Sequence, residues 1–331
     1  MFDERWPDQA EELGDALGAV LAKHCALDTL RRLDSFTDIA GGLDDLNRAV
    51  DDFGLWDLPA EPYLLTRAAV ALGEHLAPVP FVSAMPAYAV LGEKAVANGV
   101  DRQIVPAGLP RVVVTVGAGV GIGATAGAER PSAAGEQVVV LDRIEAAAIA
   151  GGADQIRAWG FLLESARLVG AAQTLLRYGV NYVSERRQFG APVGSFQGVA
   201  HPLADAATAV QSADLLTRHA AYLADTDRQV PLFGAAMAAK KAHAASRQVA
   251  ATVHQALGGY GFTIEADCQL YSRRIRAWTA AMPDPGLWLA ELARTLADPA
   301  TRNSVTDLWQ FDRGFTLPRW VSEEEDRFDG R

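Results

Sequence analysis

The stretch SERRQFGAPVGSFQ, from Ser184 to Gln197, ends one helical segment and begins another. Two interpretations are open. Arg186 and Arg187 suit the negative end of a helix dipole, and Gly190 suits a left-handed helix cap, so the stretch can be a plain helix stop. The same arginine and amide donors can instead be gathered to bind a phosphate. The rest of the chain has to decide between them.

Length, charge and cysteine content limit what the chain can be. Its 331 residues, half of them hydrophobic, suffice for one large domain or two to three modest ones. The formal net charge of -11 disfavours nucleic acid and an anionic membrane as partners. Cys25 and Cys268 have no paired spacing, which disfavours a disulfide framework or a zinc site and fits a reducing compartment.

The first residues of the chain and its apolar runs indicate in which cellular compartment to expect the protein. The opening MFDERWPDQAEELG is acidic and lacks the pattern of a signal peptide. No apolar run approaches the roughly 20 residues that a membrane helix needs. We therefore expect a soluble, cytoplasmic protein.

Helical periodicity dominates the first hundred residues, which we assign to an N-terminal helical domain, residues 1–100. In AEELGDALGAVLAKH, residues 10–24, apolar side chains recur at i, i+4, i+7 and i+8, the spacing of an amphipathic helix. Further helices are predicted over residues 43–53 and 62–76. The prolines of LAPVPFVSA, residues 76–84, then interrupt the pattern before it resumes.

Short β-branched runs replace the helical pattern in residues 101–152, which we assign to a reduced middle β domain. RVVVTV (111–116) and QVVVLD (137–142) are predicted strands. They imitate a dinucleotide-binding fold, because the glycine-rich GAGVGIGA follows the first strand and Asp142 ends the second. The spacer TAGAERPSAAGE contains a proline and almost no apolar face, so it cannot form the helix that such a fold needs. We expect a glycine-rich hairpin loop there instead.

Long helical patterns return after residue 152 and predict a C-terminal four-helix bundle over residues 153–298. The helices are predicted over residues 159–188, 197–225, 232–257 and 265–278. Gly190 should close the first, and Pro202 should kink the second or mark its true first turn. Helices of this length with short connections pack as antiparallel bundles. Residues 299–331 are predicted to be a partly ordered tail, and the fold class is mainly α.

Three segments resemble the acyl-CoA dehydrogenase family. SERRQFGAPVGSFQGVAHPLADA, residues 184–206, is similar to that family's signature around its flavin-binding arginine. HQALGGYGF, residues 254–262, is similar to its second signature and follows at the usual spacing. LAPVPFVSA resembles the end of the family's N-terminal helical domain. The resemblance implies an acyl-CoA dehydrogenase-like fold: an N-terminal helical domain, a middle β domain and a C-terminal four-helix bundle.

The resemblance also implies an FAD site shared between subunits. One subunit's β domain would hold the isoalloxazine ring, and the neighbour's bundle would contact pyrophosphate and adenosine. Arg186 matches the arginine that reaches the pyrophosphate, which a guanidinium binds through paired donors. The matching cofactor-binding positions together are Arg186, Gln188, Phe189, Phe196, Gln197, Gln255, Gly258 and Gly259. Alternatively, the diglycine can be only a helix-to-helix turn, and Arg187 a solvated helix-end charge.

Two features depart from the family pattern. The middle domain has about half the usual length, with no visible equivalent of the strands that contact the flavin ring. The family's catalytic glutamate is also missing: RAWTAAMPDPG has no carboxylate before Asp284, and the alternative position falls near Gly160. Glu164, one helical turn further on, is the remaining candidate for a displaced base. Its other interpretation is a solvated or ion-paired helix glutamate.

These features lead to the hypothesis of a base-less subunit of a hetero-oligomeric, FAD-dependent acyl-CoA dehydrogenase. A larger partner subunit would carry the catalytic glutamate and most of the acyl-CoA site, and this chain's bundle would complete the partner's FAD site. The resemblance to shortened heteromeric subunits implies CoA thioesters of bulky side chains, such as those of steroids. Two alternatives stay open: a non-enzymatic interaction module of the same fold without flavin, and a homomeric flavoenzyme with Glu164 as its base.

Overall fold

The chain is mainly helical, as predicted. Our computed structural model describes residues 2–34, 39–92, 96–98, 104–106, 113–116, 120–122, 124–131, 137–144, 148–149 and 152–298. Residues 1–286 form one compact unit, and the described part of a second unit, from Leu287 on, lies in helix α10 (Gly286–Ala297). The predicted tail, residues 299–331, is outside the described residues. Within these ranges no helix combines the length and hydropathy needed to cross a membrane.

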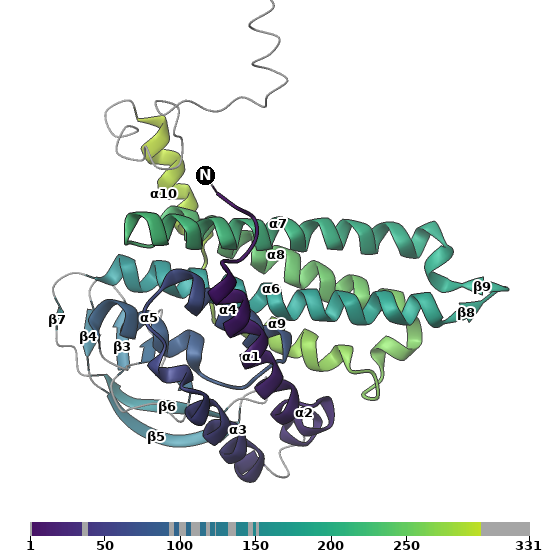
Figure 1. The fold of residues 1–331 in the computed structure, drawn as a ribbon, viewed down its shortest axis with the longest axis horizontal. Helices are drawn as coiled ribbons and strands as arrows, with labels where there is room; N and C mark the ends of the chain where they lie inside the picture. Colours follow the sequence, from purple (N-terminus) through teal and green to yellow (C-terminus); the bar gives the residue numbers. More distant parts are fainter. Residues whose placement is uncertain are drawn as a thin grey trace, which may run out of the picture. The chain divides into compact units, whose positions relative to one another are not determined.

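Five α-helices form the N-terminal part of the first unit (Figure 1). They are α1 (Asp8–His24), α2 (Leu27–Asp34), α3 (Ile39–Phe53), α4 (Pro62–Glu74) and α5 (Phe81–Leu91), with the 3-10 turn η1 (Leu55–Asp57) after α3. These helices confirm the predictions over residues 10–24, 43–53 and 62–76. α4 begins with Pro62, which suits a first helical position because the amide hydrogen there has no helical partner. α5 begins directly after Pro80.

α4 is buried along almost its whole length, because α1 packs on it from one side and α6 (Ala153–Glu185) from another. Two glycines allow the close approach of α4 and α6. A Cβ on Gly73 would overlap the Arg167 carbonyl oxygen, and a Cβ on Gly170 would overlap the Val70 carbonyl oxygen. The two backbones therefore touch, and the pair of glycines fixes the N-terminal helices against the first helix of the bundle.

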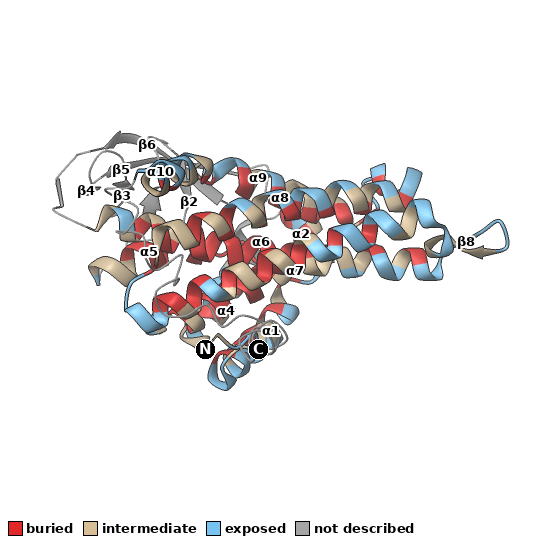
Figure 2. Cartoon of the chain, turned by 90° about the horizontal axis from the view of Figure 1, so that it is seen from above, coloured by how far each residue is buried: buried red, intermediate tan, exposed pale blue. Residues whose placement is uncertain are grey.

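α6 is the central helix of the predicted four-helix bundle. Its partners are α7 (Gln197–Asp227), α8 (Leu232–Leu257) and α9 (Cys268–Ala281). α7 begins at Gln197, so Pro202 lies in its second turn, and the prediction that Pro202 marks the first turn is wrong. Figure 2 shows buried residues following α6 and its neighbours, whereas the bundle end near β8 is mostly exposed.

The predicted end of the first bundle helix is also wrong. α6 stops at Glu185 rather than at Gly190, because the chain turns there into a short hairpin. The hairpin pairs β8 (Arg187–Gln188) with β9 (Ala191–Pro192), and a 3-10 turn, η2 (Val193–Ser195), leads on to α7.

The middle of the chain forms two small sheets in the described residues. Their strands are β1 (Val96–Asn98), β2 (Ile104–Pro106), β3 (Val113–Val116), β4 (Val120–Ile122), β5 (Ala124–Pro131), β6 (Gln137–Ile144) and β7 (Ala148–Ile149). One sheet has the order β1-β3-β4-β7 and the other the order β2-β6-β5. β1 pairs with β3 in parallel, with Val96 opposite Val113, and the other pairs are antiparallel. β3 and β6 confirm the two predicted strands.

The stretch between β3 and β6 is not the simple hairpin loop that the glycines predict. β4 and β5 occupy much of it and pair with β3 and β6. Since β3 and β6 lie in different sheets, and the described residues between them are strands, the dinucleotide-binding fold is excluded. β1 precedes residue 101, where the middle domain was predicted to begin, and the division into domains stays a prediction.

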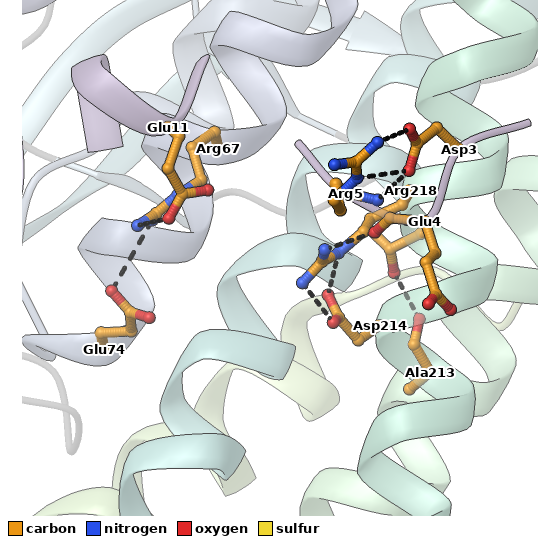
Figure 3. A network of polar contacts seen from close by, with 10 residues as sticks. Asp3, Glu4, Arg5, Glu11, Arg67, Glu74, Ala213, Asp214 and Arg218 are labelled. Atoms are coloured by element: carbon orange, nitrogen blue, oxygen red, sulfur yellow. Dashed lines mark hydrogen bonds and ion pairs between the residues drawn. The ribbon is translucent and has the colours of Figure 1, made fainter. Parts of the chain in front are cut away.

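Arg218 on α7 fastens the N-terminal residues to the bundle (Figure 3). Its guanidinium donates to the two carboxylate oxygens of Asp214, at 2.6 and 3.0 Å, and to the Glu4 carbonyl, at 2.7 Å. The guanidinium carbon also lies 4.7 Å from the ring centroid of Trp6. Residues 4–6 are therefore anchored on α7 before α1 begins.

Arg67 on α4 makes a second charged link, to α1 (Figure 3). It is buried, and its nitrogens lie 4.0 Å from a Glu11 oxygen and 3.7 Å from a Glu74 oxygen. Burial raises the pKa of Glu74, and the nearby Arg67 opposes that rise. A Cβ on Gly14 would overlap the guanidinium, so α1 leaves room for Arg67 by carrying glycine there.

Candidate functional site

The β8–β9 hairpin holds the first signature motif at one end of the bundle (Figure 1). The Arg186 amide donates to the Tyr182 carbonyl at 2.8 Å, which is the last helical bond, and the Val193 amide donates to the Arg186 carbonyl at 2.7 Å. Between the strands, Phe189 and Gly190 have φ angles of 52° and 82°. Positive φ at both central residues is typical of a two-residue hairpin turn. The expected glycine cap of a helix is therefore a hairpin turn.

The side chains of this hairpin are exposed rather than packed. Phe189 is 93% exposed and meets the ring of Phe196 edge-on at a centroid distance of 6.2 Å. Arg187 donates to the Gly190 carbonyl at 3.2 Å and so braces the turn. The Arg186 guanidinium is exposed and has no ion pair or hydrogen bond with any described residue. The two glutamines of the motif, Gln188 and Gln197, are exposed as well.

The second signature motif ends α8 and begins the turn η3 (Gly258–Phe262). Gln255, Gly258 and Gly259 are exposed. Gly258 has φ 61° and ψ -139°, a conformation that glycine adopts far more readily than other residues. The diglycine is thus a helix-to-helix turn, and it also presents backbone without side chains to the surface.

His254 fixes this turn against α9. Its Nδ1 lies 2.7 Å from the Gly261 carbonyl oxygen, and its Nε2 lies 2.9 Å from the Ser272 hydroxyl. A carbonyl oxygen only accepts, so Nδ1 carries the hydrogen in the first of these bonds. The imidazole is therefore part of the scaffold of the turn.

A tyrosine pair joins the two signature motifs. Tyr182, one turn before Arg186, stacks on Tyr260, which follows the diglycine; the ring centroids are 5.6 Å apart and the planes 14° from parallel. Burial, together with a hydrogen bond to Tyr260, raises the pKa of Tyr178, one turn earlier on α6. The structure thus brings both motifs to one end of the bundle, although no contact joins Arg186 to Gln255 in the part of the chain that it describes.

Apolar side chains gather at this bundle end. Of six large hydrophobic side chains that are exposed in the described residues, five lie within or beside the two motifs: Val180, Phe189, Phe196, Phe262 and Ile264. An apolar groove of about 480 Å³ begins beside the hairpin, between Val180 on α6 and Ala204 on α7. Exposed apolar side chains that gather in one place are a candidate site for binding another molecule.

A separate cavity of about 130 Å³ lies between α5, α6 and the residues after α9. Gly160 and Glu164 line it from α6, and Ala281, Met282 and Pro283 line it from the chain after α9. These are the two places where the family resemblance puts a catalytic base. The fold therefore brings both candidate positions to one cavity.

Glu164 is buried and ion-paired. It is 8% exposed, and its two carboxylate oxygens lie 2.9 and 2.7 Å from Nη2 of Arg167 on the next turn of α6. The Arg167 guanidinium carbon lies 4.2 Å from the ring centroid of Trp278, which is buried on α9. Both oxygens accept from the arginine, and a carboxylate paired with a cation takes up a proton less readily, although each oxygen keeps a further lone pair. Asp284 does not line the cavity; it accepts from the Gly286 amide at 2.9 Å.

The sequence analysis missed Arg167 and the Tyr182–Tyr260 pair. The ion-paired interpretation of Glu164 is confirmed, and only its partner was not named, although Arg167 stands three residues away on a helix, the spacing at which side chains meet. The tyrosine pair joins residues on two different elements, and no local pattern indicates it.

Comparisons with known proteins identify the C-terminal part. Residues 162–281 match the family model of the acyl-CoA dehydrogenase C-terminal domain. The mitochondrial short-chain specific acyl-CoA dehydrogenase of Sus scrofa is 36% identical over 112 residues, 34% of this chain and 27% of that protein. Acyl-CoA dehydrogenase FadE34 of Mycobacterium tuberculosis is 34% identical over 145 residues, 44% of this chain and 20% of that protein. The matched part thus spans well under a third of the length of these curated relatives.

Solved structures resemble the chain over most of its length. The ChsE4-ChsE5 complex of Mycobacterium tuberculosis has a TM-score of 0.75 at 20% identity, covering 90% of this chain and 99% of the matched one. Butyryl-CoA dehydrogenase of Megasphaera elsdenii has a TM-score of 0.72 at 16% identity, covering 90% of this chain and all of the matched one.

The fold is that of the acyl-CoA dehydrogenases, with a mainly helical architecture and a small middle sheet region. The residues that match the acyl-CoA dehydrogenase C-terminal domain, 162–281, contain α7, α8, α9 and most of α6.

Proposed function

We propose that the whole chain is a member of the acyl-CoA dehydrogenase family and a subunit of a hetero-oligomeric, FAD-dependent acyl-CoA dehydrogenase. One observation carries the proposal: both signature motifs lie at one bundle end with exposed side chains. Binding of a neighbouring subunit and its FAD to this surface would explain why these side chains are exposed.

The exposed groups suit an adenine dinucleotide. Arg186, which has no partner in the described residues, offers paired donors to a pyrophosphate. Phe189 and Phe196 offer apolar faces to adenosine. The proposed FAD contacts together are Arg186, Gln188, Phe189, Phe196, Gln197, Gln255, Gly258 and Gly259. At the diglycine, phosphate oxygens can approach backbone amides without hindrance from side chains.

The catalytic base is proposed to lie on the partner subunit. The dehydrogenation needs a base that removes a proton from the carbon next to the thioester, and FAD, when bound, would supply the hydride acceptor. Glu164 lines the cavity where the family resemblance puts the catalytic base, but its carboxylate is paired with Arg167. A larger acyl-CoA dehydrogenase subunit would therefore supply the glutamate and most of the acyl-CoA site.

Two structural neighbours support a hetero-oligomer. One is the ChsE4-ChsE5 complex, and the other is described as the Tcur3481-Tcur3483 steroid ACAD, with a TM-score of 0.72 and 19% identity. Both names pair two unlike components. A steroid side chain as the acyl group of this chain's complex is proposed from this likeness.

Co-expression with a candidate partner, a full-length acyl-CoA dehydrogenase encoded beside this chain, tests the proposal. We expect a stable complex with bound FAD that oxidises an acyl-CoA, and little flavin on this chain alone. Purification of this chain by itself as a yellow, active homo-oligomer would contradict it. A stable complex without flavin would instead favour a non-enzymatic interaction module.

A further inference from the structure

We infer that the exposed face of α8 and α9 docks an acidic segment of another protein. The two helices carry six lysines and arginines and no aspartate or glutamate, whereas the whole chain has a formal net charge of -11. A cationic face on an acidic protein attracts and orients acidic partners. Neither of the two cavities described above includes a cationic side chain of α8 or α9.

Four of these cations are accessible to solvent. Lys240, Arg247 and Arg276 are exposed, and Lys241 is half-buried. The side chains of Arg247 and Arg276 make no ion pair or hydrogen bond with any described residue. Their charges are therefore available to a partner.

Two contacts place α9 alongside α8 in the opposite direction. Near the end of α8, Nε2 of His254 lies 2.9 Å from the hydroxyl of Ser272, early in α9. Near the start of α8, Nζ of Lys240 lies 3.7 Å from an oxygen of Asp284, just after α9. Arg276 lies one turn after Ser272, on the same side of α9. The cations of the two helices therefore belong to one surface.

The charges of Lys240 and Arg247 act on the same place. His243 lies between them on α8, and burial together with these two cations lowers the pKa of His243. Asp284 opposes this effect. The side chains of the Lys240–Asp284 pair are 54% and 64% exposed, and an ion pair so exposed contributes little. A partner's carboxylate can therefore replace Asp284 beside Lys240 at little cost.

The spacing of the cations favours an extended partner over a small anion. Lys240 and Arg247 are seven residues apart on α8, which is about 10 Å along the helix axis. A phosphate or a single carboxylate cannot contact both. Ala244 is exposed between them, so a polypeptide can lie along this surface without meeting a large side chain. An acidic helix with carboxylates two turns apart matches both cations.

A protein segment fits this face better than a nucleic acid. A DNA duplex carries one negative charge per about 1.7 Å, and the net charge of -11 repels so dense a polyanion. A short acidic segment contacts the cationic face alone. The inference goes beyond the proposed function, because it requires neither FAD nor an acyl-CoA, and the two can fail separately.

The test is the binding of a fluorescein-labelled poly-L-glutamate peptide of about 14 residues, which as a helix is about 21 Å long. Fluorescence anisotropy with the full chain measures its affinity. We expect saturable binding that weakens at least tenfold between about 0.01 M and about 0.15 M salt, as the Debye length falls from about 30 Å to about 8 Å. No saturable binding at the lower salt concentration, or tighter binding of single-stranded DNA of equal length, would overturn the inference.

Charge reversal locates the binding. The double variant Lys240→Glu/Arg247→Glu should weaken binding of the peptide at least tenfold. Lys23→Glu/Arg48→Glu is the matched control, because both residues are exposed on helices of the N-terminal part and the net charge changes equally. Equal losses in the two double variants would show a general effect of net charge and overturn the inference.

A variant that gains affinity keeps the inference testable if the charge reversals do not fold. Asp284→Asn removes the carboxylate beside Lys240 and keeps an oxygen that can accept from the Gly286 amide. The peptide should then bind about threefold more tightly than it binds the wild type. An unchanged affinity would count against the assigned face.

The chain's own sequence contains an acidic run, EEEDRFD, residues 323–329. The triple variant Glu323→Gln/Glu324→Gln/Glu325→Gln tests whether this run competes with the peptide. We expect it to leave the affinity for the peptide unchanged. An affinity at least tenfold higher would show that the run occupies the face and would overturn the assignment to another protein.

Discussion

Tyr182 and Tyr260 lie face to face between the end of α6 and the turn after α8, with ring centroids 5.6 Å apart. Tyr182 lies two residues before the first signature motif, and Tyr260 lies within the second. The stack therefore fixes the distance between two surfaces that come from residues more than seventy positions apart in the sequence.

Replacing Tyr182 by alanine should loosen this link. We expect a loss of about 1–2 kcal/mol in the free energy of unfolding, because an aromatic pair contributes roughly 0.5–1.5 kcal/mol beyond its buried area. Flavin retention in the assembled complex should fall as well. Urea denaturation and flavin absorbance measure the two effects. Tyr182→Phe is the control and should keep both; a loss of stability in Tyr182→Ala with full flavin content would make the stack purely structural.

Arg186→Ala distinguishes a cofactor site from a helix end. A hydrogen bond to a charged group contributes roughly 1.5–3 kcal/mol, which is about one to two decades in affinity. We expect FAD retention to weaken by that factor while the circular dichroism of the helices stays unchanged. Arg186→Lys should rescue only part of it, since lysine lacks the planar pair of donors.

Arg187→Ala is the matched control for Arg186. Its side chain braces the hairpin by donating to Gly190, so a smaller loss of flavin is expected from it. If neither substitution changes the flavin content, the stretch that opens α7 is only a connection between helices.

Glu164→Gln tests where the base lies. If the partner carries the base, turnover of the complex at full flavin content should stay within about twofold of the wild type. Stability should fall by about 1–3 kcal/mol, because the charged hydrogen bonds to buried Arg167 are weakened. Steady-state kinetics and chemical denaturation separate the two. Abolished turnover in a folded, flavin-loaded complex would identify Glu164 as the base and remove the partner from that role.

Gly170→Ala should destabilise the chain by about 1–3 kcal/mol, since its Cβ would overlap the Val70 carbonyl and force α4 away from α6. Gly160→Ala, ten residues earlier on the same helix, has open space for its Cβ and should gain up to about 1 kcal/mol from helix propensity. Thermal unfolding compares them directly. Equal effects of the two substitutions would show that the helices do not touch at Gly170.

The helices were predictable because their apolar spacing repeats over several turns, as in α1. Pro62 and the proline-rich stretch before α5 also mark where helices begin. β4 and β5 were missed because they are rich in glycine and alanine, which have little strand preference. These two segments are strands because they pair with β3 and β6. The strand order and the two separate sheets depend on that pairing as well.

The sequence predicts a set of candidate site residues but not their geometry. The motif predicted that Arg186 contacts a pyrophosphate, but it did not predict the hairpin, which depends on Phe189 taking a positive φ that phenylalanine rarely adopts. Glu164 could be recognised as a candidate base, whereas its pairing with Arg167 over Trp278 needed a contact between α6 and α9.

α6 also sets the distance between the cavity and the hairpin. Gly160 in the cavity wall and Tyr182 beneath the hairpin are 22 residues apart on one continuous helix, which at a rise of about 1.5 Å per residue separates them by roughly 33 Å. A substitution at Gly160 should therefore leave the proposed FAD contacts at the hairpin unchanged, because the two places are about six helical turns apart.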